Sequence, residues 1–291
     1  MNIEFVKMQG TGNDYIYIDC TGSVDISLSC PQIQAMCDRH YGIGADGVIF
    51  IRKSNVAVAT MDMHNRDGSK GSMCGNGVRC VGKFLYDRYY DDIHIDIDTS
   101  CGIKKLEIIT QDGSATGARV DMGTAVLQCD RIPVLSEQGN IDIPLEIGGQ
   151  IFECTCVSMG NPHAVVFTDC VESIDLDKIG SEIETHPAFP ERVNVEFVRV
   201  ISDSELQMRV WERGTGETKA CGTGACAAVV AGVLKGFCKY DRQVTVHLPG
   251  GDLDIVYYKD GRVEMTGDAV EVFCGSIEVD ETEILESGNG V

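Results

Sequence analysis

The sequence predicts an α+β fold of the α/β-roll kind, with two pseudo-symmetric halves in which a β-rich, barrel-like sheet wraps around a central helix. Three observations support this fold class. Landmark residues recur at a spacing of about half the chain, alternating strand patterns fill both halves, and each half carries a cysteine and two glycines directly before an apolar segment. A chain of 291 residues is long for one core and sufficient for two.

An internal duplication is indicated by motifs that keep one order in both halves. The first half contains MCGNGVRC and the second contains ACGTGACAA. Four pairs of landmarks are separated by 147 or 148 residues: Cys74 and Cys221, Asn65 and Glu212, Gly47 and Asn194, and Asn13 and Asn161. A single match would be uninformative, whereas four matches at one spacing indicate a repeated unit.

Strands are predicted where apolar and polar residues alternate, because successive side chains of a strand face opposite sides of a sheet. Asp112-Gly113 and Asp260-Gly261 are typical of tight hairpin turns. The predicted strands cover 3–8, 14–19, 47–53, 56–62 and 94–99 in the first half, and 141–148, 150–159, 163–169, 195–201 and 205–211 in the second.

Fewer helices are predicted. One covers 31–40, with a rough counterpart around 175–184, and the others follow the two glycine-flanked cysteines. The segment CAAVVAGVLKG after the second cysteine is apolar nearly all round, which indicates a buried helix. Gly236 stands where it would end that helix after Lys235.

The repeat also predicts the domains, with a boundary inside 122–131. We expect an N-terminal half at 1–125, a C-terminal half at 126–267, a segment at 268–280 that returns to the first half, and an acidic tail at 281–291.

Composition excludes several classes of protein. A net charge of −21 repels phosphate backbones, so we expect no nucleic-acid partner. No apolar run approaches the length of a membrane span, so we expect no membrane partner. The N-terminal MNIEFVKMQGTGN lacks the features of a secretion signal, and we therefore expect a cytoplasmic protein.

The fourteen cysteines are expected to be mostly reduced, because the chain is long and carries no secretion signal. There is no CxxC and no zinc-type spacing, so we expect no metal. Cys154 and Cys156 alternate along a strand-like segment, which favours packing on one face over metal binding. The GxGxxG at 42–47 has a helix-like segment before it and a strand after it, the reverse of a dinucleotide site, and we interpret it as a turn.

Two cysteines at helix N-termini suggest acid–base chemistry. Unpaired amides and the helix dipole lower a thiol pKa, to between about 3.5 and 7.5 in reactive sites. Glycines beside the cysteine let the backbone amides approach a carboxylate. A facing pair of thiols is suited to inverting a stereocentre, because one removes the α-proton while the other delivers a proton to the opposite face. Such a reaction does not require pyridoxal phosphate.

The motifs resemble those of the diaminopimelate epimerases, cofactor-independent enzymes that interconvert LL- and meso-diaminopimelate. The resemblance covers nearly the whole chain and implies an active site in the cleft between the halves, a small-molecule substrate, no cofactor, a role in lysine and peptidoglycan precursor biosynthesis, and a homodimer. It rests on GTGND, DRHYGIGADG, NRDGSKGSMCGNGVRC, MGNPHAV, RVNVEFV, WERGTGETKACGTGACAA and LPGGDLDI.

The resemblance also implies roles for individual residues. Cys74 and Cys221 are the acid/base thiols, and His163 and Glu212 tune a thiol. Glu212 and Arg213 bind the ammonium and carboxylate of the head group that does not react. The full set implied to bind substrate is Asn13, Asn65, Gly75, Asn76, Asn161, Asn194, Glu212, Arg213, Gly222 and Thr223. Three residues depart from the family pattern and bear on local packing: Ser72, Trp211 and Asp268.

Alternative interpretations remain beside this one. Asn13 and Asn161, taken singly, are typical turn formers, and Glu212 with Arg213 is compatible with a solvated ion pair. Two activated thiols also suit a thiol–disulfide redox sensor, although the lack of CxxC counts against it. A non-catalytic amino-acid-binding domain is a third hypothesis.

Overall fold

The computed structural model describes residues 1–22, 26–71 and 73–279 and divides the chain into two compact units. Unit 1 comprises Met1–Val120 and the segment that begins at Asp268, and unit 2 comprises Asp121–Gly267. The acidic tail predicted at 281–291 lies outside the described residues, as does Ser72. Within the described ranges, no helix is both long enough and apolar enough to cross a membrane.

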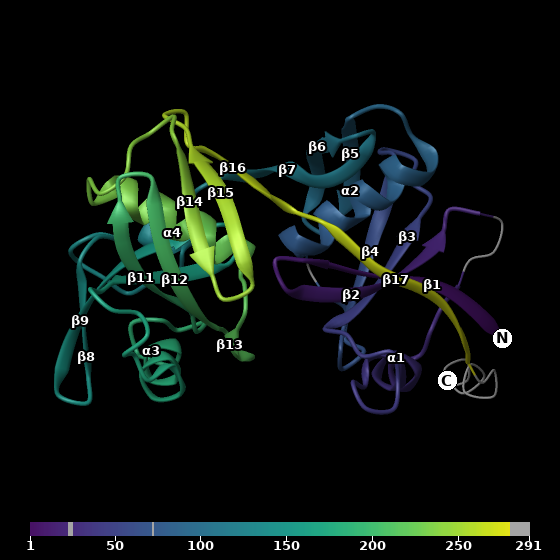
Figure 1. Cartoon of the computed structure of the whole chain (residues 1–291). Coiled ribbons are helices and arrows are strands. Elements are labelled where there is room, and N and C mark those ends of the chain that lie inside the picture. The colour runs from purple at the N-terminus through teal and green to yellow at the C-terminus, as the bar shows by residue number, and fades with distance from the viewer. Residues whose placement is uncertain (23–25, 72, 280–291) are drawn as a thin grey trace. The chain divides into compact units, whose positions relative to one another are not determined.

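Unit 1 is a sheet wrapped around helix α2, as Figure 1 shows for β1, β2, β5 and β6. On α2 the apolar side chains Val78, Val81 and Leu85 face inward, while Lys83 and Asp87 form an ion pair one turn apart on the outer side. The elements of unit 1 are β1 Asn2–Gly10, β2 Asn13–Cys20, α1 Cys30–Cys37, β3 Gly47–Arg52, β4 Ala59–Asn65, α2 Gly75–Tyr89, β5 His94–Thr99, β6 Gly102–Gln111, β7 Ser114–Thr124, which continues into unit 2, and β17 Val270–Glu278.

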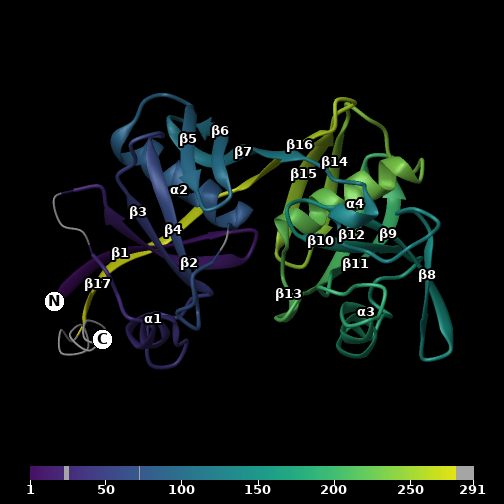
Figure 2. The ribbon, with the colours of Figure 1, turned by 180° about the vertical axis from the view of Figure 1, so that it is seen from behind.

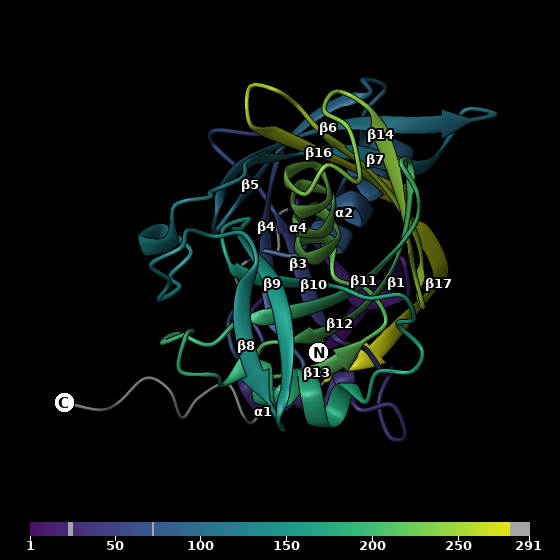
Figure 3. The same ribbon diagram turned by 90° about the vertical axis from the view of Figure 1, so that its left-hand side faces the viewer.

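Unit 2 repeats this arrangement around helix α4. Strands β9 and β10 lie beside α4 when the molecule is seen from behind (Figure 2), and the hairpin of β8 and β9 is prominent in Figure 3. The elements of unit 2 are a 3₁₀ turn Cys129–Arg131, β8 Ile143–Ile147, β9 Gln150–Ser158, β10 Pro162–Phe167, a π-helical turn Leu176–Gly180, α3 Ser181–Glu184, β11 Asn194–Ser202, β12 Glu205–Glu212, β13 Gly216–Thr218, α4 Gly222–Leu234, β14 Gln243–Leu248, β15 Gly251–Tyr257 and β16 Arg262–Asp268.

Helix α4 is buried on all sides, as its apolar sequence predicts. Its end at Gly236 is also confirmed, because Gly236 adopts a φ of 79°, which favours glycine. The amide of Gly236 donates to the Val233 carbonyl at 3.0 Å, and that of Phe237 donates to the Gly232 carbonyl at 2.8 Å. This pair of bonds is the Schellman arrangement that satisfies the last carbonyls of a helix.

The internal duplication is confirmed by strand register. Corresponding strands pair in the same way in both units, first in parallel and then antiparallel. Tyr15 lies opposite Gly47 and His163 opposite Asn194 in the parallel pairs, and Ile49 lies opposite Met63 and Glu196 opposite Val210 in the antiparallel pairs. The two residues of each equivalent pair are 147 or 148 positions apart in the sequence. The pairing between strands is therefore repeated together with the sequence motifs.

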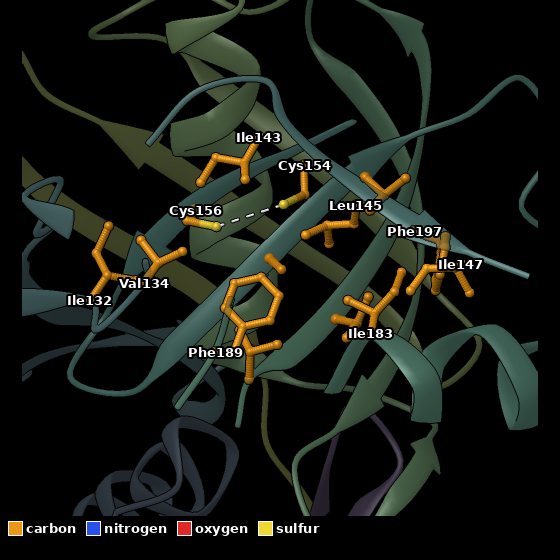
Figure 4. Packing of buried hydrophobic residues seen from close by; sticks show 14 of the residues in the cluster. Ile132, Val134, Ile143, Leu145, Ile147, Cys154, Cys156, Ile183, Phe189 and Phe197 are labelled. Atoms are coloured by element: carbon orange, nitrogen blue, oxygen red, sulfur yellow. Dashed lines mark hydrogen bonds between the residues drawn. The ribbon is translucent and has the colours of Figure 1, made fainter. Parts of the chain in front are cut away.

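The core beside β8 and β9 shows why Cys154 and Cys156 occur in this sequence (Figure 4). Alternate residues of β8 point inward, and both cysteines of β9 are fully buried beside them. Their sulfur atoms are 3.8 Å apart within an apolar cluster. The predicted packing role on one strand face is confirmed.

Several elements differ from the sequence prediction. Helix α1 ends at Cys37, three residues before the predicted end at 40. Strand β4 begins at Ala59, three residues later than predicted, after a bend at 55–58. The helix predicted around 175–184 is irregular, because a π-helical turn precedes α3. Gly180 lies where this turn meets Trp211, and a Cβ atom added at Gly180 would stand 2.8 Å from the Cβ of Trp211. Close packing against Trp211 therefore leaves no room for a side chain at position 180.

Candidate active site

Cys74 is the N-cap residue of α2, as the sequence predicts. Its backbone is extended, and its sulfur accepts a hydrogen bond from the Gly77 amide at 3.4 Å. The thiol of Cys74 also donates to Oδ1 of Asn13 at 3.0 Å. The sulfur therefore lies at the positive end of the helix dipole and contacts one of the asparagines implied to bind substrate.

The amide of Asn13 has a fixed orientation. Its Nδ2 donates to the carboxylate of Asp46 at 2.7 Å, and a carboxylate accepts hydrogen bonds but does not donate them. Oδ1 of Asn13 must therefore face Cys74. Asp46 is held in turn by Arg39, at 2.8 Å.

The other residues implied to bind substrate in unit 1 differ in their surroundings. Asn76 is 2% exposed, and its Oδ1 has no hydrogen-bond partner among the described residues. The carbonyl of Gly75 accepts from the fully buried Arg79 at 3.4 Å, which ties down the first turn of α2. Asn65 is partly exposed, and its amide donates to Ser69 at 3.0 Å rather than to Cys74 or Asn13.

Cys221 is the N-cap residue of α4 and is 6% exposed. Its sulfur lies 3.5 Å from the hydroxyl of Thr223. The expectation of a low thiol pKa is wrong for Cys221. Burial raises the pKa of the Cys221 thiol well above its ordinary value, and the carboxylates of Glu212 and Glu196 raise it further. The Thr223 hydroxyl and the Gly224 amide oppose this rise by donating hydrogen bonds to the sulfur.

A chain of polar side chains leads from Cys221 into the core of unit 2. Asn161 donates from Nδ2 to the Thr223 hydroxyl at 3.3 Å. The Oδ1 atom of Asn161 lies 3.0 Å from Nε2 of His163. Nδ1 of His163 lies 2.7 Å from Oε1 of Glu196, and neither of these last two side chains is exposed. Both ring nitrogens of His163 are therefore engaged by Glu196 and Asn161 rather than by the sulfur.

Asn194 is buried, and both the nitrogen and the oxygen of its side-chain amide form hydrogen bonds with the backbone. Nδ2 donates to the Pro162 carbonyl at 2.9 Å, and Oδ1 accepts from the amide of Arg213 at 2.9 Å. Asn194 thus positions the loop after β12. The Arg213 side chain donates to the carbonyl of Glu191 at 3.0 Å. The Glu212 carboxylate accepts from the Thr218 hydroxyl.

The pKa of Glu212 is raised, chiefly by burial and also by the charge of Glu196. Hydrogen bonding from Thr218 and the charge of His163 act in the opposite direction. A carboxylate in this setting is poorly solvated until a cation arrives, so an ammonium group would be a suitable partner.

Sequence reasoning missed two residues beside the thiols. Tyr15 contacts Cys74, and its pKa is raised by burial and by that thiol. Glu196 lies at the end of the polar chain that begins at Cys221. The available signal was the charge itself, because Glu196 interrupts the apolar segment VEFV where the first repeat has the uncharged GVIFI. Among residues 1–22, 26–71 and 73–279, no group of three or more histidine, cysteine or acidic side chains could hold a metal ion.

Comparisons with known proteins connect these residues to one family. The sequence model described as "Diaminopimelate epimerase" matches residues 5–128 and 155–272. A diaminopimelate epimerase from Leptospira biflexa is 48% identical over 283 residues, covering 96% of this chain and 100% of that relative. One from Methanococcus maripaludis is 49% identical over 280 residues, covering 95% of this chain and 100% of that relative.

Solved structures share the fold at low sequence identity. A probable proline racemase from Agrobacterium radiobacter aligns with a TM-score of 0.67 and 13% identity, covering 99% of this chain and 96% of that one. A phenazine biosynthesis protein of the PhzF family from Bacillus anthracis aligns with a TM-score of 0.67 and 12% identity, covering 96% of this chain and 100% of that one. These likenesses support the predicted α+β fold with two pseudo-symmetric halves.

Proposed function

The chain belongs to the diaminopimelate epimerase family, and from this premise we propose that it interconverts LL-2,6-diaminopimelate and meso-diaminopimelate. The protein is an isomerase of amino-acid biosynthesis, on the route to lysine. We propose that the same reaction also supplies peptidoglycan precursors.

The proposed mechanism uses Cys74 and Cys221 as a two-base pair. The thiolate of one removes the α-proton and becomes a thiol. The thiol of the other gives its proton to the opposite face of the carbon and becomes a thiolate. The number of protons on the enzyme is unchanged, and the roles are exchanged for the reverse reaction. The observation that carries this proposal is the matched position of the two cysteines, each the N-cap of a helix in its own repeat.

Backbone amides would stabilise the carbanion. The amides of Gly75 and Asn76 in unit 1 and of Gly222 and Thr223 in unit 2 belong to the first turns of their helices, where N–H groups lack intrahelical partners. Such donors stabilise a carboxylate as negative charge develops beside it. With acid, base and anion stabilisation supplied by the protein, the reaction requires no cofactor.

The distal head group of the substrate carries both charges. We propose that Glu212 pairs with its ammonium and Arg213 with its carboxylate. Asn194 supports this subsite indirectly, because it holds the Arg213 amide. Asn13, Asn65 and Asn161 supply neutral donors and acceptors.

We further propose a cytoplasmic homodimer. A two-thiol mechanism needs both sulfurs reduced, and a reducing compartment maintains that state. The dimer would cover the apolar side chains on β17, where Val272 is 54% exposed and Phe273 is 46% exposed. Light scattering after size exclusion should give twice the chain mass for the wild type and the chain mass for Phe273→Glu.

Solvent exchange tests the proposed function. Reduced enzyme is incubated with LL-diaminopimelate in deuterated water, and the α-proton signal is followed by NMR. Deuterium should enter as the meso isomer forms. Absence of exchange with fresh, reduced enzyme would overturn the proposal. Proline and glutamate serve as competing substrates that should not exchange.

Cysteine variants test the assigned roles. Cys74→Ala and Cys221→Ala should each lower epimerisation by about 10²–10⁴-fold, the usual contribution of an acid–base group. Cys101→Ala removes an exposed thiol and should leave the rate unchanged. Assays of oxidised and reduced protein separate the epimerase from a thiol–disulfide redox sensor. A redox sensor would stay functional when oxidised or change its function, whereas the epimerase should only lose activity.

A further inference from the structure

The turn between β12 and β13 carries Arg213, the residue proposed to bind the distal carboxylate of the substrate. Two consecutive backbone amides of this turn donate to buried side chains. The amide of Arg213 donates to Oδ1 of Asn194 at 2.9 Å, and that of Gly214 donates to Oε1 of Glu184 at 2.9 Å. Asn194 is 4% exposed and Glu184 is 5% exposed. Because these bonds form away from water, they fix the peptide planes on both sides of the Arg213 side chain.

The carboxylate of Glu184 is used at both of its oxygen atoms. Oε1 accepts from Gly214, and Oε2 accepts from Nε1 of the Trp211 indole at 2.7 Å. Arg192 places its guanidinium 3.5 Å from Oε1. A backbone amide, an indole and a guanidinium donate hydrogen bonds and do not accept them. Each of these three partners is therefore a donor, and a glutamine of the same shape would present an acceptor to only one of the two N–H groups.

The indole of Trp211 is held along its length. Gly180 packs against its near end, where an added Cβ atom would stand 2.9 Å from Cγ. Gly216 packs against its far end, where an added Cβ atom would stand 3.5 Å from Cη2. The ring also packs against the apolar core beside β8 and β9. Packing therefore fixes the direction of the indole N–H, which points at the carboxylate of Glu184.

The first repeat holds the corresponding turn by a bond of the opposite direction. Gln34 on α1 donates to the backbone carbonyl of Asp67 at 2.8 Å, and this contact is exposed. His64 stands at the position equivalent to Trp211, and its ring lies edge-on to Phe50. The buried carboxylate is thus a feature of the second repeat, in which the turn carries residues proposed to bind the distal head group.

We propose that Glu184 is a positioning residue that, together with Trp211, fixes the backbone beside Arg213 and so sets the affinity of the enzyme for the distal carboxylate of the substrate. Its action passes through the amide of Gly214. The consequence for substrate binding rests on the proposed epimerase function, whereas the contacts of Glu184 do not. Because the distal head group does not react, the loss of this support should fall on KM rather than on kcat.

NMR of the enzyme without substrate tests these contacts. Trp211 is the only tryptophan of the chain, so its indole N–H gives a single signal. In Glu184→Gln the charged acceptor is lost, so the indole proton signal should move upfield, and the indole and the Gly214 amide should exchange with deuterated solvent about tenfold faster. Glu182→Gln replaces an exposed carboxylate of the same short helix and should leave both signals unchanged. Unchanged indole and Gly214 signals in Glu184→Gln would overturn the proposal, whether or not the enzyme epimerises diaminopimelate.

Initial rates test the consequence for binding. Glu184→Gln should raise KM for diaminopimelate about tenfold and leave kcat within about twofold, whereas Glu182→Gln should keep wild-type values. Adding Trp211→Phe to Glu184→Gln removes the indole donor, so the single amide oxygen is free to accept from Gly214. The double variant should therefore have a lower KM than Glu184→Gln alone. A loss that falls on kcat instead of KM, or a double variant with no improvement in KM, would contradict the proposal.

Discussion

Glu196 and Ile49 occupy the same place in the two repeats. Glu196 lies on β11 opposite Val210, and Ile49 lies on β3 opposite Met63. Both β11 and β3 pair in parallel with the strand before them and antiparallel with the strand after them. Each also lies against the second glycine of its Cys-Gly-x-Gly motif: added Cβ atoms would stand 2.7 Å from Oε1 of Glu196 and 2.9 Å from Cδ1 of Ile49. The duplicated architecture thus holds a charged network beside one cysteine and an apolar contact beside the other.

This relationship predicts different outcomes for the same substitution in the two repeats. In Gly77→Ala the new methyl group meets the ends of Ile49 and Met61, which can shift, at a cost of about 1–3 kcal/mol in the free energy of unfolding. In Gly224→Ala it meets the buried Glu196 carboxylate and should displace it from His163. We expect Gly224→Ala to lower kcat about tenfold more than Gly77→Ala at matched folded fraction. Equal kcat values for the two folded variants would contradict the asymmetry.

Much of this architecture could be predicted from sequence because duplication and alternation are strong signals. Strands such as Gly47–Arg52 and the helices after Cys74 and Cys221 occur where the motifs place them. Strand β17 was not identified, because its side chains are exposed on both faces and its pattern carries little periodicity. The Asp112-Gly113 hairpin was identified because both residues need a positive φ, 52° and 82°.

The sequence predicted which residues belong to the site, but not which hydrogen-bond partner each of them has. A pattern can mark Asn194 as repeated, yet only the fold shows that both sides of its amide are bonded to the backbone. The low pKa expected of Cys221 failed because a motif reveals the helix dipole and not the burial or the two nearby carboxylates. Glu196 was overlooked because its role depends on His163, which is 33 residues away in sequence.

The buried Glu212 carboxylate should lower the stability of the folded protein, although it is proposed to bind the substrate ammonium. Its pKa is raised in the folded state, so between the ordinary value of 4.5 and the raised one the folded protein holds more protons than the unfolded chain. The free energy of unfolding therefore falls as pH rises through that window. Glu212→Gln should melt at a higher temperature than the wild type at neutral pH and show less pH dependence there. Its KM should rise about ten- to a hundredfold, because a charge-assisted bond to the ammonium is lost.

Melting curves and initial rates across that pH range check both expectations for Glu212. Glu217→Gln is the matched control, because Glu217 lies nearby on β13 and pairs with Arg209 at a more exposed position. It should change neither KM nor the pH dependence of melting. If Glu212→Gln melts at a lower temperature than the wild type at neutral pH, the buried carboxylate does not destabilise the folded protein and the prediction is wrong.

Asp46 should act on Cys74 through the orientation of Asn13. In Asp46→Ala the Asn13 amide loses the acceptor for its Nδ2 and is free to turn over, which removes the acceptor from Cys74. We expect kcat to fall about three- to tenfold, the value of one neutral hydrogen bond. Arg39→Ala removes the ion pairs with Asp46 and Asp14 but not the bond from Asn13 to Asp46, and should stay within about twofold of the wild type. Equal losses in both variants would point to the ion pair instead.

The raised pKa of Cys221 predicts a distinctive pH dependence of alkylation. The thiolate is the species that reacts with iodoacetamide, so the rate follows the fraction of thiol that has ionised. Burial, Glu212 and Glu196 raise the pKa of Cys221 well above 9.0. Its labelling should therefore still be accelerating at about pH 10, where an ordinary thiol with a pKa near 8.5 has levelled off. Peptide mass spectrometry after short pulses gives the rate for Cys221 and for the exposed Cys101 in the same sample. Glu212→Gln removes one of the causes and should shift the Cys221 curve to lower pH without moving that of Cys101. A Cys221 curve that levels off below pH 8 in the wild type would mean that the helix dipole outweighs burial at this sulfur.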